Sequence, residues 1–153
     1  MTVTGYGAVS RGRDVSVRAL GEIKPARNNA LSEKLAYIYR EIEGIIIEVG
    51  PDAVAVEGLF HAKNVKSAIR LGHARGVLLL ASARQNIPVY EYAPREVKAA
   101  ATGYGGAGKD QVGAMVKRFL SLDCDIGDHA CDALAVAVCH MHSMGPLGMK
   151  KTV

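Results

Sequence analysis

Apolar residues recur along the chain with two periods, one typical of helices and one typical of strands. Between residues 31 and 49 the spacing of three and four predicts an amphipathic helix, with apolar positions at Leu31, Leu35, Ile38, Ile42, Ile45, Ile46 and Val49. Asn28 and Asn29 are candidate caps, and Gly50-Pro51 ends the helix. The continuous apolar run 53–56 then predicts a strand buried on both faces, and this strand ends in Glu57.

The remaining segments alternate between strand and helix patterns. Further strands are predicted over 3–9, 15–23 and 88–92, the first two forming a hairpin around the turn 11–14. Further helices are predicted over 63–86, 94–101, 109–120 and 128–142. This alternation indicates an α/β domain with a mixed sheet flanked by helices. We expect one domain over 1–142 and a flexible tail over 143–153.

Charge is spread unevenly along the chain. The net charge is +4, but residues 61–118 carry ten Lys and Arg against three acids, whereas the segments on either side are slightly acidic. A basic band of this kind favours attraction to a phosphate backbone. A solvated, lysine-rich surface is the alternative. The chain has no Trp and only two Phe, so the core must be aliphatic.

The cysteine pattern and the absence of long apolar runs bear on location. Cys124, Cys131 and Cys139 are odd in number and form no C-x-x-C motif, so a zinc site or a disulfide framework is not expected. The N-terminal residues do not resemble a signal peptide, and no apolar run approaches the roughly 20 residues of a membrane span. We therefore expect a cytoplasmic protein with no membrane partner.

Three side chains are candidates for a metal-dependent site. Glu57 ends a buried strand, and ligands and metals bind at the carboxyl ends of strands in parallel α/β sheets. His129 and Asp132 are three residues apart on a predicted helix and share one face. Imidazole and carboxylate can both bind a divalent metal. Two alternatives remain open: an ordinary acidic first helical turn, and a site in which Asp128 replaces His129.

The glycine-rich segment 103–108 precedes Lys109 and Asp110. It fits the G-x-x-x-x-G-K pattern but ends in Asp, where a nucleotide-binding loop needs Ser or Thr to bind Mg²⁺. A nucleotide-binding switch is therefore disfavoured. We interpret the segment as a loop that brings Lys109 to a phosphate backbone.

Residues 58–64 join the strand that ends at Glu57 to the next helix. Phe60 is either a core residue under the loop or an exposed ring that stacks on DNA bases. Lys63 and Asn64 lie at the predicted helix N-terminus, where backbone N–H groups favour phosphate. The segment is therefore a candidate DNA contact.

Several motifs together resemble one family, the RuvC crossover-junction endonucleases, in both order and spacing. They are Val3-Thr-Gly-Tyr-Gly-Ala8, Ala55-Val-Glu57-Gly-Leu-Phe60-His-Ala-Lys63-Asn64, Leu71-Gly-His-Ala-Arg75-Gly76, Pro94-Arg95-Glu-Val-Lys98, Gly108-Lys109-Asp-Gln-Val112 and Asp132-Ala-Leu-Ala-Val-Ala137. The resemblance spans roughly residues 2–142 and implies a ribonuclease H-like fold.

The resemblance also implies roles for individual residues. Glu57, His129 and Asp132 fall on catalytic, metal-binding positions, although some members have Asp where this chain has His129. Lys98 and Lys109 fall near the scissile phosphate, and Phe60 falls at the junction centre.

The family's activity implies the expected partners and cofactors. We expect a homodimer that resolves four-way (Holliday) junctions in recombination and repair, together with the RuvA and RuvB branch-migration proteins. The resemblance implies phosphodiester hydrolysis with Mg²⁺, two ions per subunit, with Mn²⁺ as a possible substitute. The helix over 63–86, with Gly72 and Gly76, is the candidate dimer face.

One departure from the family pattern affects both fold and activity. Family members have a strand and turn of the pattern Leu-Gly-Ile-Asp-Pro-Gly before Val-Thr-Gly-Tyr-Gly, whereas Met1-Thr2 directly precede Val3 here. That strand is central in the family sheet, and its Asp is the first catalytic carboxylate. We therefore expect an N-terminally shortened family member that lacks the central strand. A cleavage-dead junction-binding dimer is the alternative function.

Overall fold

The computed structural model describes residues 3–58, 65–123 and 125–144. Its strands are β1 (Thr4–Arg11), β2 (Val15–Ile23), β3 (Val54–Glu57) and β4 (Val89–Tyr92). Its helices are α1 (Leu31–Val49), α2 (Val65–Arg84), α3 (Pro94–Thr102), α4 (Lys109–Phe119) and α5 (Asp128–Ser143). Each described element lies within two residues of the range that the sequence predicts, because period and breaker residues are local signals.

The first helix shows one error in the sequence interpretation. Its N-cap is Ala30, not Asn28 or Asn29, and the Ala30 N–H donates to Glu33 Oε2 at 2.9 Å. Glu33 therefore supplies the acceptor from inside the helix, which makes a capping Asn unnecessary. At the other end Gly50 adopts the left-handed conformation at φ +58°, as glycine allows at a helix C-terminus.

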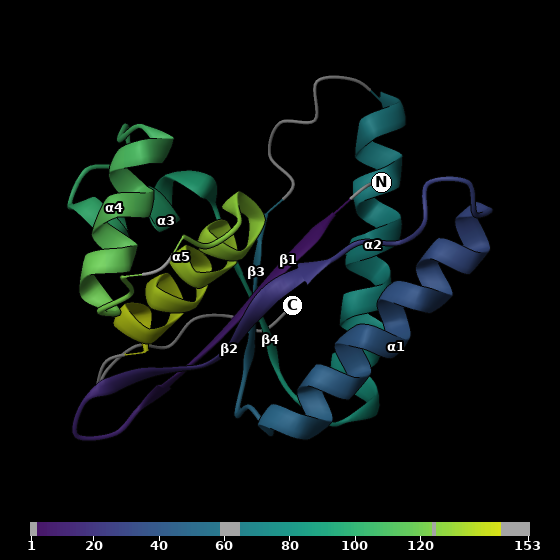
Figure 1. Cartoon of the computed structure of the whole chain (residues 1–153), viewed down its shortest axis with the longest axis horizontal. Helices are drawn as coiled ribbons and strands as arrows, with labels where there is room; N and C mark the ends of the chain where they lie inside the picture. The colour runs from purple at the N-terminus through teal and green to yellow at the C-terminus, as the bar shows by residue number, and fades with distance from the viewer. Residues whose placement is uncertain (1–2, 59–64, 124, 145–153) are drawn as a thin grey trace.

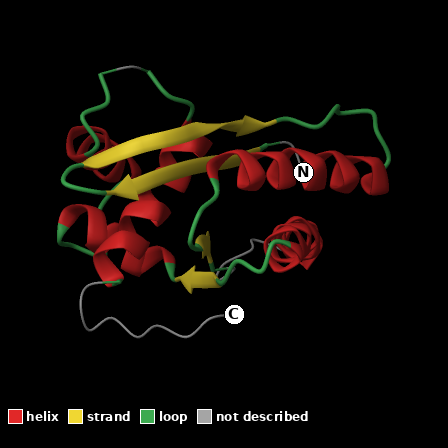
Figure 2. Ribbon diagram, turned by 90° about the horizontal axis from the view of Figure 1, so that it is seen from below, coloured by secondary structure: helices red, strands yellow, loops and turns green. Residues whose placement is uncertain are grey.

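The strands form two separate pairs. β1 and β2 are antiparallel, with a register shift at Ala8/Val9, and β3 and β4 are parallel. Figure 2 shows the long hairpin well apart from the short β3 and β4. The sequence predicted one mixed sheet. Within the described residues both strand orientations occur, but no strand lies between β1 and β3 to join the pairs.

Helices pack on both sides of the strands and enclose two apolar clusters. Figure 1 shows α3, α4 and α5 on one side and α1 and α2 on the other. The first cluster includes Tyr92, Val116 and Leu134, and the second includes Ile38 and Ile42. Both clusters are mainly aliphatic, as the composition requires.

Two glycines let β1 lie directly against α5. A Cβ at Gly5 would be 1.9 Å from the His129 carbonyl oxygen, and a Cβ at Gly7 would be 2.6 Å from Leu134 Cδ2. Side chains at these positions would therefore force the strand and helix apart. This contact sets the position of the first turn of α5, which carries His129 and leads to Asp132.

Three further sequence predictions concern the glycines of α2, the C-terminal tail and the absence of a membrane span. Among the residues that the structure describes, no atom of another element lies within 4 Å of a Cβ placed at Gly72 or Gly76, so neither glycine packs on another described element. The last helix extends to Ser143, one residue beyond the predicted end, and the rest of the predicted tail from residue 145 lies outside the described residues. None of the helices in the described ranges is long and apolar enough to cross a membrane.

Candidate functional site

Glu57, His129 and Asp132 line one cavity, although they come from distant parts of the sequence. The cavity has a volume of about 900 Å³ and lies between β1 and β3, with walls from α1, α2 and α5. Helix α5 contacts both strands (Figure 1), which brings its first turn to the C-terminal end of β3. Asp128, the alternative to His129, is not among the residues that line the cavity.

The two carboxylates interact electrostatically. The pKa of Glu57 is raised, first because neighbouring atoms desolvate its carboxyl group and second because Asp132 is negatively charged. Lys98 on α3 partly offsets this rise. Glu57 is nevertheless exposed as a residue, so a ligand entering the cavity can reach it. Two repelling carboxylates at one cavity form a site that a cation would stabilise.

A lysine provides positive charge at the same place. Lys109 Nζ lies 3.2 Å from Asp128 Oδ2 and 3.3 Å from Asp132 Oδ2. These bonds raise the pKa of Lys109, the Asp128 contact contributing most. The Lys109 side chain is 58% exposed, so solvent screens its ion pairs with the two carboxylates. A divalent cation can therefore displace the lysine from the carboxylates, and a phosphate can compete with the carboxylates for the lysine.

The structure brings five of the predicted site residues together. Glu57, His129 and Asp132 line the cavity, Lys109 binds Asp132, and Lys98 is close enough to Glu57 to influence its charge. The other predicted DNA-contacting residues, Phe60, Lys63 and Asn64, lie outside the described residues.

The carboxylates of Glu57 and Asp132 are the type of oxygen ligand that Mg²⁺ prefers. Within the described residues, no group of three or more His, Cys, Asp or Glu side chains is gathered closely enough to hold a metal ion by itself. Mg²⁺ does not need such a cage, because it keeps several waters and binds through one or two carboxylates plus substrate phosphates. Glu57 and Asp132 offer these carboxylates at the same cavity.

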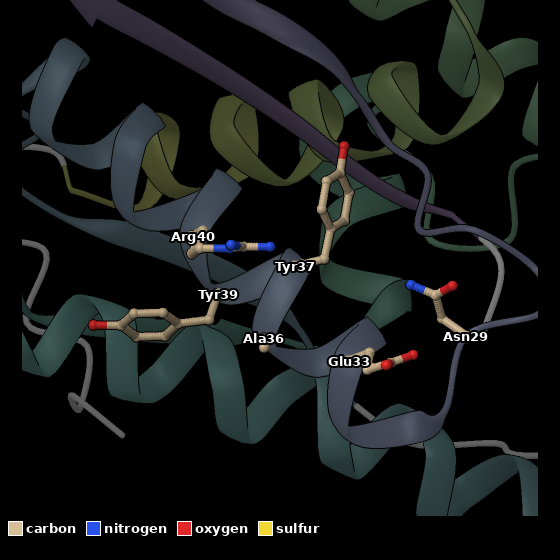
Figure 3. Close-up of a pocket in the computed structure, with 6 residues that line it drawn as sticks. All are labelled: Asn29, Glu33, Ala36, Tyr37, Tyr39 and Arg40. Atoms are coloured by element: carbon tan, nitrogen blue, oxygen red, sulfur yellow. The ribbon is translucent and has the colours of Figure 1, made fainter.

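A second hollow lies at the start of α1 and has no comparable chemistry. It has a volume of about 480 Å³ and is lined by Asn29, Glu33, Ala36, Tyr37, Tyr39 and Arg40. Figure 3 shows the two tyrosine side chains pointing away from each other, so the lining residues do not converge on one ligand position. None of the predicted site residues belongs to it.

Sequence reasoning missed one residue that touches the site. Glu22, in β2, accepts a hydrogen bond at Oε1 from the His129 N–H at 3.2 Å. The two residues are 107 positions apart, and no local motif links them. A lone acid in a strand gives no signal of such a contact, which only the packing of β2 beside α5 creates.

Comparisons with known proteins agree with this arrangement. A family model described as "Crossover junction endodeoxyribonuclease RuvC" matches residues 1–140. A curated protein of that description from Thermotoga maritima is 46% identical over 143 residues, covering 89% of this chain and 85% of its own length. Another from Natranaerobius thermophilus is 44% identical over 138 residues, covering 89% and 86%.

Solved structures match as well. The structure of Thermus thermophilus RuvC aligns with a TM-score of 0.87 and 28% identity, covering all of this chain and 94% of that one. The same protein in complex with a Holliday junction substrate aligns with a TM-score of 0.83, covering 92% and 87%. The motifs, the α/β architecture, the family match over most of the chain and the close relatives lead to one conclusion. The chain belongs to the RuvC family of crossover junction endodeoxyribonucleases.

Proposed function

We propose that this protein is a structure-specific endonuclease that resolves four-way DNA junctions by metal-dependent hydrolysis of phosphodiester bonds. The observation that carries the proposal is the shared cavity of Glu57 and Asp132, where burial and, to a smaller extent, the charge of Asp132 raise the pKa of Glu57. A nicking assay tests it, using a synthetic four-way junction with Mg²⁺ and a linear duplex of the same sequence. Cleavage of the junction supports the proposal, whereas junction binding without product supports a cleavage-dead dimer.

Glu57, Asp132 and His129 would hold Mg²⁺, two ions per subunit, and Mn²⁺ would replace it. When bound, the metal supplies positive charge at the phosphate and lowers the pKa of the attacking water. Carboxylate oxygens suit both ions. His129 lines the same cavity, and its imidazole would accept or donate a proton there.

The lysines bind the scissile phosphate. Lys109 contacts Asp132 directly, and Lys98 lies near Glu57, so both cations flank the carboxylates. A phosphate placed between them gains charge-assisted hydrogen bonds. Phe60, Lys63 and Asn64 follow Glu57 in the chain, and we assign them further contacts to the junction.

Replacing Lys109 by Ala is expected to slow junction cleavage by about 10²-fold, the usual loss when one donor to a developing negative charge is removed. Lys117→Ala is the matched control, since Lys117 lies on the same helix and pairs with Asp125 at 3.8 Å instead. Single-turnover cleavage rates of the two variants provide the measurement. Equal rates for Lys109→Ala and Lys117→Ala would contradict the role of Lys109.

The dimer face is proposed on α2. Val65, Ile69, Gly72, Gly76 and Leu80 follow one another at steps of three and four, so they form one stripe along the helix. All five are exposed, with Val65 76% and Ile69 54% accessible. An apolar stripe interrupted by two glycines, with no packed partner within the described chain, suits close approach by a second copy of the same helix.

Replacing Ile69 by Glu is expected to convert the dimer into a monomer, because two buried carboxylates would face each other across a two-fold axis. Sedimentation velocity measures the change. Ile47→Glu is the control, since Ile47 is 65% exposed on α1 and lies outside the stripe. If Ile69→Glu remains dimeric, the interface does not include this part of α2.

The wider assignments rest on family membership. We propose that the protein acts in the cytoplasm in recombination and repair and works with the RuvA and RuvB branch-migration proteins. Co-sedimentation of the three proteins on a four-way junction tests this partnership.

A further inference from the structure

We propose that Glu22 is a positioning residue that fixes the first turn of α5, and with it His129 and Asp132, by capping the helix from the neighbouring hairpin. This inference rests on the proposed function, because its consequence for catalysis requires that the first turn of α5 belongs to the active site.

The first turn of α5 lacks a cap of its own. The N-cap residue is Gly127, and no side chain at that position makes a cap hydrogen bond. The first N–H groups of any helix have no partner inside the helix and need an acceptor from elsewhere. For His129 that acceptor is Glu22 Oε1, which belongs to β2. A carboxylate at this end of a helix also complements the positive end of its dipole.

The carboxylate is itself held in place from two sides. Its other oxygen, Oε2, lies 2.7 Å from Lys24 Nζ, and the Glu22 side chain is only 15% exposed. The Lys24 hydrogen bond is also the main reason why the pKa of Glu22 is lowered, so the carboxylate stays ionised at neutral pH. Glu22 is therefore a fixed acceptor and not a mobile surface acid.

The local glycines show that the contact is built into the packing. A Cβ at Gly127 would lie 2.3 Å from Glu22 Oε1, so glycine leaves the space that the carboxylate occupies. Gly5, in β1, allows that strand to approach the carbonyl of His129 in the same helical turn. The hairpin thus packs against the His129 carbonyl through β1 and accepts a hydrogen bond from the His129 N–H through β2, and Asp132 follows one turn later.

The functional consequence concerns the metal site. Hydrogen-bonding partners that orient metal ligands commonly affect metal affinity by about 10–100-fold. Loss of the Glu22 contact frees the first turn of α5 to fray and misplaces Asp132 relative to Glu57. We expect Glu22→Ala to raise the Mn²⁺ concentration for half-saturation by about tenfold. Its affinity for the junction in metal-free buffer should change less than about twofold.

Four variants test the mechanism. Hydrogen exchange of the amides in 128–132, which needs neither metal nor DNA, should be about fivefold faster in Glu22→Ala. Glu22→Gln keeps an oxygen acceptor and should stay within about threefold of the parent protein. Lys24→Ala removes the ion pair but leaves the Glu22 carboxylate in the chain, so it measures how much of the effect depends on the ion pair and should change exchange less than Glu22→Ala does. Gly127→Ser in the Glu22→Ala background supplies a local N-cap in the vacated space and should restore both slow exchange and Mn²⁺ binding.

The outcomes separate this inference from the proposed function. Unchanged amide exchange in Glu22→Ala, or failure of Gly127→Ser to rescue that variant, would overturn the capping role. If Glu22→Ala does not fold alone, recovery of folding by Gly127→Ser supports the role and lack of recovery overturns it. A parent protein that neither cuts junctions nor binds Mn²⁺ would refute the proposed function, while the exchange data would still decide the capping role.

Discussion

Glu57→Gln is expected to reduce junction cleavage by about 10³-fold while leaving junction affinity within about twofold. The substitution keeps the size and hydrogen-bonding oxygen of the side chain but removes the negative charge that a divalent metal needs. Junction affinity comes mainly from phosphate contacts of basic residues, which this change does not touch. Cleavage rates at saturating Mg²⁺ and binding in metal-free buffer provide the two measurements.

A stability measurement tests whether Glu57→Gln loses cleavage only because the variant unfolds. Because burial and Asp132 raise the pKa of Glu57, its ionised form is disfavoured in the folded state, and stability falls as pH rises through that pKa. Removing the charge should therefore leave the metal-free melting temperature at neutral pH unchanged or slightly higher. Glu48→Gln, on the exposed side of α1, is the control. Undiminished cleavage by Glu57→Gln would remove Glu57 from the mechanism.

An extension that adds one strand before Met1 is expected to raise the melting temperature by about 10 °C. The edges of β1 and β3 that face the cavity carry backbone groups with no strand partner in the described residues. A segment of the family pattern Leu-Gly-Ile-Asp-Pro-Gly placed between them would form several backbone hydrogen bonds, each worth about 1 kcal/mol. A net gain of about 3–4 kcal/mol corresponds to this shift in a domain of this size.

Two altered extensions separate the structural effect from the catalytic one. Replacing the Ile of the extension by Pro removes a backbone donor in mid-strand and should abolish the thermal gain. Replacing its Asp by Asn should keep the thermal gain but not increase cleavage, since the carboxylate would be the added metal ligand. If the protein with the unaltered extension melts at the same temperature as the parent protein, the added segment does not form a strand in the cavity.

The sequence predicted the elements well because the relevant signals are local. The helix spacing from Leu31 to Val49 and the strand that ends at Glu57 both appear where the period indicated. The cap at Ala30 was predicted wrongly because Asn28 and Asn29 looked like caps, whereas the helix supplies its own acceptor from Glu33. The family resemblance indicated which of the many acidic residues form one site. In the structure, Glu57 and Asp132 line the same cavity.

What the sequence by itself determined is the order of strands and helices, the aliphatic core and the short list of acids and lysines, because these depend on neighbouring residues and residue chemistry. Only the tertiary structure decided which charges interact. Lys109 bridges Asp128 and Asp132 across 19 residues or more, and Glu22 caps His129 across 107. The resemblance predicted that the central strand is missing, but only the fold showed the cavity between β1 and β3 and the residues that line it, since the packing of distant segments has no local pattern.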